Sequence, residues 1–123
     1  KKYYTGREGV IVITHTGDHR AGHYLTVLDL ETLEVKIKGE DNIFHRSFVE
    51  IFDNFIYAVV IVEGKYYLGK FDQNMTMAAR SEEALQPDTF ISNYRDRVYV
   101  SNVNDEIISI SKSDLSTLSK ITP

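Results

Sequence analysis

The heptapeptide Phe52-Asp53-Asn54-Phe55-Ile56-Tyr57-Ala58 indicates the fold, because a related heptapeptide follows it at an offset of 42 residues. The second copy is Tyr94-Arg95-Asp96-Arg97-Val98-Tyr99-Val100. Aromatic residues, turn-forming residues and strand-forming residues occupy matching places in the two copies. A recurrence at this period indicates a structural repeat. Tyr57 and Tyr99 fix its register, and we expect both to pack in the core.

Three aspartates extend the repeat along the chain. Asp72 and Asp114 are 42 residues apart, and Asp29 precedes Asp72 by 43 residues. The segments Asp29-Leu30-Glu31-Thr32-Leu33 and Asp114-Leu115-Ser116-Thr117-Leu118 are almost the same. An aspartate followed by small or polar residues accepts hydrogen bonds from the backbone that follows it, and so begins a tight turn. We therefore expect all three aspartates to have structural roles in turns.

Each repeat divides into four short strands separated by turn signals. The sequence predicts one all-β domain over residues 1–123, with units of about 42 residues at 1–40, 41–81 and 82–123. The expected strands, unit by unit, are 2–5, 10–14, 23–28 and 34–38; 48–52, 55–62, 66–71 and 75–79; and 89–92, 98–103, 107–111 and 118–121. Only Ser81–Leu85, ahead of Pro87, is expected to form a helical turn.

Composition excludes several classes of protein. Hydrophobic residues make up 42% and charged residues 26% of the chain, which favours a packed fold over disorder. The net charge is −4 and the basic residues are dispersed, so no nucleic-acid partner is expected. The longest uncharged apolar run, Phe55–Val62, is too short to cross a membrane as a helix. The chain begins without methionine, and we expect it to be a trimmed part of a longer protein.

The third unit resembles a known family of repeats. The segments Val98-Tyr99-Val100-Ser101-Asn102, Glu106-Ile107-Ile108-Ser109-Ile110 and Asp114–Leu118 are similar to the bacterial YVTN-type β-propeller repeat, and the related PQQ-like repeats look similar too. The resemblance is clearest over residues 89–121. It implies three four-stranded antiparallel blades. Since such propellers close with about six to eight blades, it also implies a cut fragment of a larger propeller, a ring completed by self-association, or an open stacked array.

One loop concentrates the candidate binding residues. His15, Asp18, His19 and His23 lie between two expected strands, and imidazole and carboxylate groups are suitable ligands for zinc, copper or nickel. However, their spacing has no special geometric meaning in a glycine-containing loop. We therefore predict no metal and no cofactor, and a loop that faces a partner. Tyr66 is a further candidate, because adjacent Tyr66 and Tyr67 point to opposite faces and one of the pair is available for binding.

The sequence contains no constellation typical of an enzyme. It has no Gly-x-Ser-x-Gly elbow, phosphate-binding glycine loop or dinucleotide fingerprint, and no catalytic residue is assigned. We expect a non-catalytic binding or scaffold module that presents loops to a protein or glycan. By the resemblance it belongs to a bacterial envelope or surface protein, in the periplasm or at the cell surface. Absent cysteine is compatible with that compartment but also with the cytoplasm. The alternative is a fragment of a propeller enzyme, quinoprotein or glycan-active, whose active site needs further blades.

Overall fold

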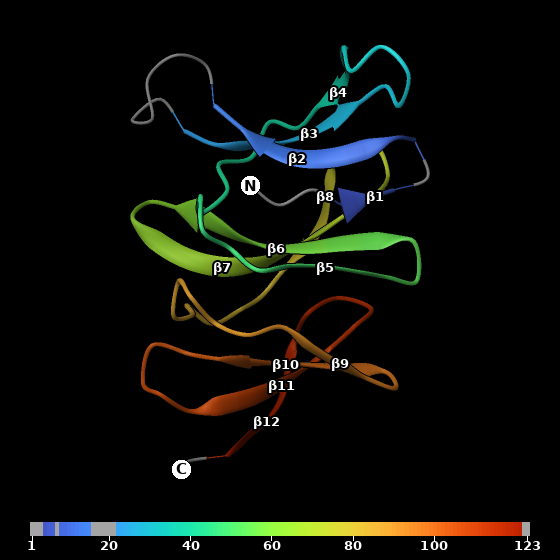
Figure 1. Cartoon of the computed structure of the whole chain (residues 1–123). Helices are drawn as coiled ribbons and strands as arrows, with labels where there is room; N and C mark the ends of the chain where they lie inside the picture. Colours follow the sequence, from blue (N-terminus) through green and yellow to red (C-terminus); the bar gives the residue numbers. More distant parts are fainter. Residues whose placement is uncertain (1–3, 7, 16–21, 122–123) are drawn as a thin grey trace.

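The computed structural model describes residues 4–6, 8–15 and 22–121, and in these residues all regular structure is β. Twelve strands form three antiparallel sheets of four (Figure 1). Unit 1 contains β1 (Tyr4–Thr5), β2 (Val10–Thr14), β3 (Tyr24–Leu28) and β4 (Val35–Lys38); unit 2 contains β5 (Val49–Phe52), β6 (Phe55–Val62), β7 (Lys65–Phe71) and β8 (Met77–Arg80); unit 3 contains β9 (Ser92–Tyr94), β10 (Arg97–Ser101), β11 (Ile107–Ser111) and β12 (Thr117–Ile121). The predicted all-β fold with three four-stranded units is confirmed.

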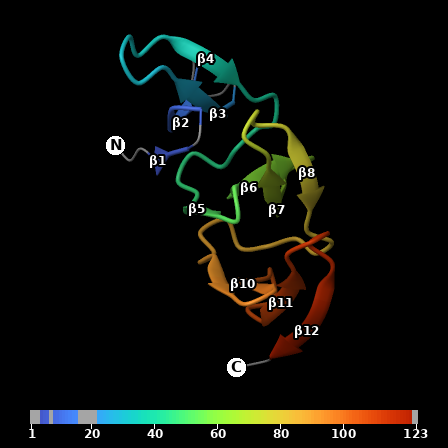
Figure 2. The same ribbon diagram turned by 90° about the vertical axis from the view of Figure 1, so that its right-hand side faces the viewer.

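Each sheet is a meander, because its strands pair in the order in which they follow one another in the chain. The three sheets stack face to face. Figure 2 shows them fanned along an arc, with β1 and β5 on the inner side and β4, β8 and β12 on the outer side. This arrangement is consistent with propeller-type blades.

Two apolar layers hold the units together. The layer between units 1 and 2 includes Ile11, Leu25 and Val27 from unit 1 and Ile56, Ala58, Val60, Phe71 and Met75 from unit 2. The layer between units 2 and 3 includes Tyr57 and Leu68 from unit 2 and Val98, Val100, Ile108, Ile110 and Leu115 from unit 3. β6 therefore contributes to both layers. Burial on both faces explains why its sequence is a continuous apolar run rather than an alternating one.

The segments that lead into β5 and β9 share a hydroxyl anchor. Ser47 Oγ accepts a hydrogen bond from Val59 N at 2.8 Å and donates to Phe48 O at 2.6 Å. Thr89 Oγ1, 42 residues later, accepts from Ser101 N at 2.7 Å and donates to Phe90 O at 2.8 Å. Each hydroxyl thus ties the connecting segment to the second strand of the unit that it enters.

The helical turn expected at Ser81–Leu85 is wrong. Ser81 N donates to Leu68 O at 2.8 Å and Leu85 N donates to Tyr66 O at 2.7 Å, so both ends of the segment bind β7. Leu85 also forms a β-bridge with Asn102. Leu85 N–H is the group that would close a helical turn onto Ser81 O, and because it binds β7 instead, the segment is a bent connector without a helix.

In unit 3, the turn before the fourth strand begins at a different residue from the one that the sequence repeat predicts. Asp29 Oδ1 accepts hydrogen bonds from two backbone N–H groups of its turn, and so does Asp72 Oδ1. Asp29 N donates to Glu34 O, but the corresponding bond in unit 3 runs from Ser111 N to Ser116 O. Asp114 lies three residues further into that turn, where it accepts from Ser116 N at 3.0 Å. The alignment shifts because the paired residues Val98 and Ile110 of the β10–β11 hairpin are 12 positions apart, whereas the equivalent Ile56 and Phe71 of the β6–β7 hairpin are 15 apart.

Candidate functional site

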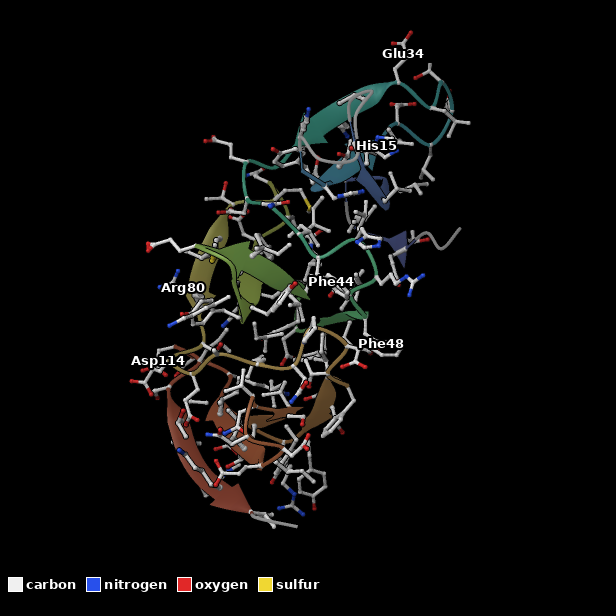
Figure 3. The ribbon with its side chains drawn as sticks, turned by 90° about the vertical axis from the view of Figure 1, so that its left-hand side faces the viewer. His15, Glu34, Phe44, Phe48, Arg80 and Asp114 are labelled. Atoms are coloured by element: carbon white, nitrogen blue, oxygen red, sulfur yellow. The ribbon has the colours of Figure 1, made fainter. Side chains whose placement is uncertain are left out.

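Five rings form a continuous row at the end of the sheets where β2 connects to β3 and β6 to β7. In order they are His15, His23, His45, Phe44 and Tyr66, hereafter the ring row. Their neighbouring ring centroids are separated by 5.3, 5.3, 5.1 and 5.5 Å. The row crosses from unit 1 to unit 2. Figure 3 labels two of its members, His15 in unit 1 and Phe44 in the connector that enters unit 2.

The connector between β4 and β5 places the two central rings. Ile43 N donates to His23 O at 2.7 Å, and Phe44 N donates to Val59 O at 2.9 Å, so this backbone bridges units 1 and 2. Asn42 strengthens the same junction, because its Oδ1 accepts a hydrogen bond from His23 N at 3.0 Å. The side chains that follow are consequently held between the ends of β3 and β6.

The geometry of the row matches favourable ring contacts. Phe44 meets Tyr66 at an interplanar angle of 80° and His45 at 63°, which are edge-to-face arrangements. His45 is exposed, whereas the other four rings are half-buried. A surface of this kind offers ring edges and faces to a ligand, while packing of the rings against each other limits their rotation.

The structure brings together three of the residues that the sequence singled out for binding. His15, His23 and Tyr66 all belong to the ring row, although Tyr66 was selected for a different reason from the histidines. Asp18 and His19 lie outside the described residues. Phe44 and His45 were missed, since two rings in a segment predicted as a connector carry no spacing that indicates a site.

No metal centre is visible in the part of the chain that the structure describes. Among residues 4–6, 8–15 and 22–121, no group of three or more His, Asp or Glu side chains is placed to hold an ion. Asp18 and His19 of the predicted loop cluster lie outside these residues, so the expected absence of metal stays a prediction. Within the same residues, no helix is long and apolar enough to cross a membrane.

A second candidate is a pocket of about 520 Å³ between units 2 and 3. The buried Lys70 side chain donates from Nζ to Lys112 O at 2.6 Å and lies 4.2 Å from the centroid of the Phe55 ring. Lys112 Nζ in turn lies 3.4 Å from Asp53 Oδ2. These cationic groups join one unit to the next. The pocket is therefore explained as part of the interface rather than as a ligand site.

The two tyrosines that fix the repeat have different environments. Tyr57 is buried between units 2 and 3, and its burial, with a smaller effect of the Asp53 charge, raises its pKa to about 12. Tyr99 occupies the same position in unit 3 but is half-buried, on the face of β10 that points away from unit 2. The sequence repeat thus fixes the position of the side chain, and the neighbouring unit determines its burial.

Comparison with models of known protein families gives no match, and no curated protein matches the sequence. The resemblance to YVTN-type repeats therefore depends on the residues quoted above.

Proposed function

We propose that this chain is a non-catalytic binding and scaffold module whose ring row contacts a protein or glycan partner. The observation that supports the proposal is the row itself, five rings in contact across two units. Aromatic rings supply large contact areas at a small loss of side-chain entropy, and they are enriched in the centres of interfaces. An imidazole adds a polar edge that can donate or accept a hydrogen bond.

The partners of the acidic side chains support binding rather than acid–base chemistry. Asp29, Asp72 and Asp114 each accept hydrogen bonds from the backbone of their own turns. The Glu83 carboxylate accepts from Asn102, Thr117 and Lys120. Desolvation alone would raise the Glu83 pKa, but these hydrogen bonds outweigh it and the pKa is lowered. Each of these carboxylates is thus engaged by a structural contact.

The wider setting is part of the same proposal. The stacked four-stranded units along an arc favour propeller-type blades, and the resemblance of residues 89–121 favours a bacterial envelope or surface protein. In that setting the ends of the sheets form the rim of the molecule. The ring row would then be presented at the rim.

A binding screen with a matched pair of variants tests the function. The purified chain is applied to an array of oligosaccharides and to a phage-displayed peptide library. The test variant combines Phe44→Gln with His45→Ala. Gln86 is the equivalent of Phe44 in the connector that enters unit 3, because Thr89 N donates to Gln86 O just as Ser47 N donates to Phe44 O. The fold therefore tolerates glutamine at this position.

The control is Phe90→Ala, which removes an exposed ring from unit 3 outside the row. We expect ligands of the parent chain to be retained by the control and lost by the test variant. Ligands that bind both variants equally, or a screen without any ligand, would contradict a binding role for the row.

A further inference from the structure

Three turn residues occupy the same position in the three units. Leu33, Met75 and Leu115 each lie two residues before the fourth strand of their unit and have φ angles of 59°, 62° and 62°. Each donates its backbone N–H to the first residue of the turn: to Asp29 O, Asp72 O and Ser111 O respectively. Their environments differ sharply. Met75 and Leu115 are 1% and 0% exposed, whereas Leu33 is 62% exposed.

The preceding unit explains this difference. Met75 belongs to the apolar layer with unit 1, and Leu115 belongs to the layer with unit 2. Residues within the sheets show the same dependence on a preceding unit. The cross-strand pairs Ile56–Phe71 in unit 2 and Val98–Ile110 in unit 3 are buried. The corresponding pair in unit 1, Val10–Leu28, is only half-buried.

Unit 1 therefore carries an uncovered face, hereafter the leading face, made of apolar side chains. Direct cross-strand pairing places Val10 beside Leu28 and Leu28 beside Val35. Val35 is 64% exposed. The apolar part of the face consists of Val10, Val12, Leu28, Leu33 and Val35, and the paired Thr26 and Lys38 lie beside it on the same side of the sheet. In units 2 and 3 the equivalent face is the one that the preceding unit covers, so the structure itself shows which kind of surface fits it.

The matching surface is present at the other end of the same chain. Unit 2 covers unit 3 with Phe52, the last residue of β5, and with Tyr57, the third residue of β6. The equivalent residues of unit 3 are Tyr94, which is 57% exposed, and the half-buried Tyr99. Together with Arg95 and Arg97 they form the trailing face.

The charges of the two faces are complementary. Between units 2 and 3, Asp53 of the β5–β6 turn pairs with Lys112 of the β11–β12 turn at 3.4 Å. In unit 3 the position of Asp53 is held by Arg95, which has the same left-handed backbone (φ 57° against 54°). The turn before β4, which corresponds to that of Lys112, carries Asp29, Glu31 and Glu34 and no basic residue. Relative to the Asp53–Lys112 pair, the basic residue now lies on the trailing face and the acidic residues on the leading face. The two faces would therefore still attract each other.

We propose that a second copy of this chain covers the leading face, with the trailing face of one molecule docked against unit 1 of the next. The contact would repeat the two interfaces within the chain. It is heterologous, so successive additions along the arc of Figure 2 produce rings or open assemblies rather than a symmetric dimer. This inference is independent of the ring row, which lies at the ends of the sheets.

Sedimentation equilibrium of the 123-residue chain from about 1 to 500 μM tests the association, a range that covers contacts of moderate affinity. We expect a mass at least twice the 14.1 kDa of one chain at the upper end. Leu33→Asp should weaken association by about tenfold or more, because it places a charge at a position whose equivalents, Met75 and Leu115, are fully buried by the preceding unit. Leu33 is exposed, and aspartate tolerates its left-handed backbone, so folding should be preserved.

The matched control is Val103→Asp, which makes the same kind of change at a residue that is 54% exposed in the β10–β11 turn, away from both faces. It should associate like the parent. Arg95→Glu and Glu31→Arg should each weaken association, and a chain with both changes should recover it. A single-chain mass at every concentration, or association that neither Leu33→Asp nor Arg95→Glu weakens, would overturn the proposal.

Discussion

Phe52 and Tyr57 stack with their ring centroids 4.1 Å apart and an angle of 14° between the ring planes. Both side chains lie in the layer between units 2 and 3, and Lys112 of unit 3 places its Nζ 4.9 Å from the centroid of the Phe52 ring. The pair, together with Phe55, is thus the aromatic part of the contact by which unit 2 supports unit 3.

Replacing Tyr57 with alanine should lower the free energy of unfolding by about 3 kcal/mol or more, since it removes a buried ring from an interface between units. The same change at Tyr99 should cost about 1 kcal/mol, because this ring is only half-buried. Denaturant unfolding of both variants measures the difference. Equal losses would mean that burial between units does not set the contribution of this repeated position.

The raised pKa of Tyr57 predicts a difference at alkaline pH. Its hydroxyl titrates near pH 12 in the folded protein and near the ordinary value of 10.0 when unfolded. The neutral form is therefore favoured by folding, and this contribution is complete below pH 10 and is lost as the pH rises towards 12. Between these values, stability should fall more steeply in the parent than in Tyr57→Phe. Tyr99→Phe is the control, and a parallel decline in the parent and Tyr57→Phe would contradict the prediction.

Asn102 should be among the residues least tolerant of change. Its buried amide donates from Nδ2 to Glu83 at 3.0 Å and to Glu106 at 2.9 Å, and its Oδ1 accepts from Asn104 N and Glu106 N. Asn102→Ala removes these four hydrogen bonds from a buried position and should cost about 3 kcal/mol in thermal or denaturant unfolding.

Asn102→Asp provides the more specific test. The change keeps the oxygen that accepts from the turn but places a carboxylate beside those of Glu83 and Glu106. Repulsion should make it worse than alanine at neutral pH. Its deficit relative to the parent should shrink as the pH is lowered, because protonation within the cluster of three carboxyl groups removes the repulsion. A deficit that does not change with pH would rule out this electrostatic explanation.

The histidine-rich segment should function without structural metal. Elemental analysis of the purified chain should find far less than one zinc per molecule, and a chelator should leave the melting temperature unchanged. Added zinc should not raise it. Stoichiometric zinc together with a chelator-induced fall in melting temperature would establish a metal site at His15, Asp18, His19 and His23.

Local patterns predicted the strands well, because β6, β7, β10 and β11 combine strand-forming residues with clear turns. They failed where a segment depends on neighbours that are distant in the sequence. β9 begins at Ser92 rather than at residue 89, since the hydroxyl of Thr89 binds Ser101 N and belongs to the connector. Ser81–Leu85 forms no helical turn for the same reason, since Leu85 N binds Tyr66 O of β7.

The candidate site was only partly predictable. The number of histidines in one loop made them candidate binding residues, and the alternation of Tyr66 with Tyr67 in a strand made Tyr66 another. The contact between them depends on a connector whose backbone binds His23 O on one side and Val59 O on the other. Neither bond has a local sequence signature. The similarity of Asp114–Leu118 to Asp29–Leu33 was also misleading about register, because the length of the whole β10–β11 hairpin, strands included, determines which residue begins the next turn.

The position of β6 in both apolar layers has a consequence for the dynamics of the chain. Unit 2 has a neighbour on each side, whereas units 1 and 3 each have one, so opening at either end disrupts a single interface and opening in the middle disrupts two. Backbone amides in β6 and β7 would exchange with solvent deuterium only in the rarest fluctuations. Those of β3 and β4 would exchange sooner, in openings that leave the middle sheet intact.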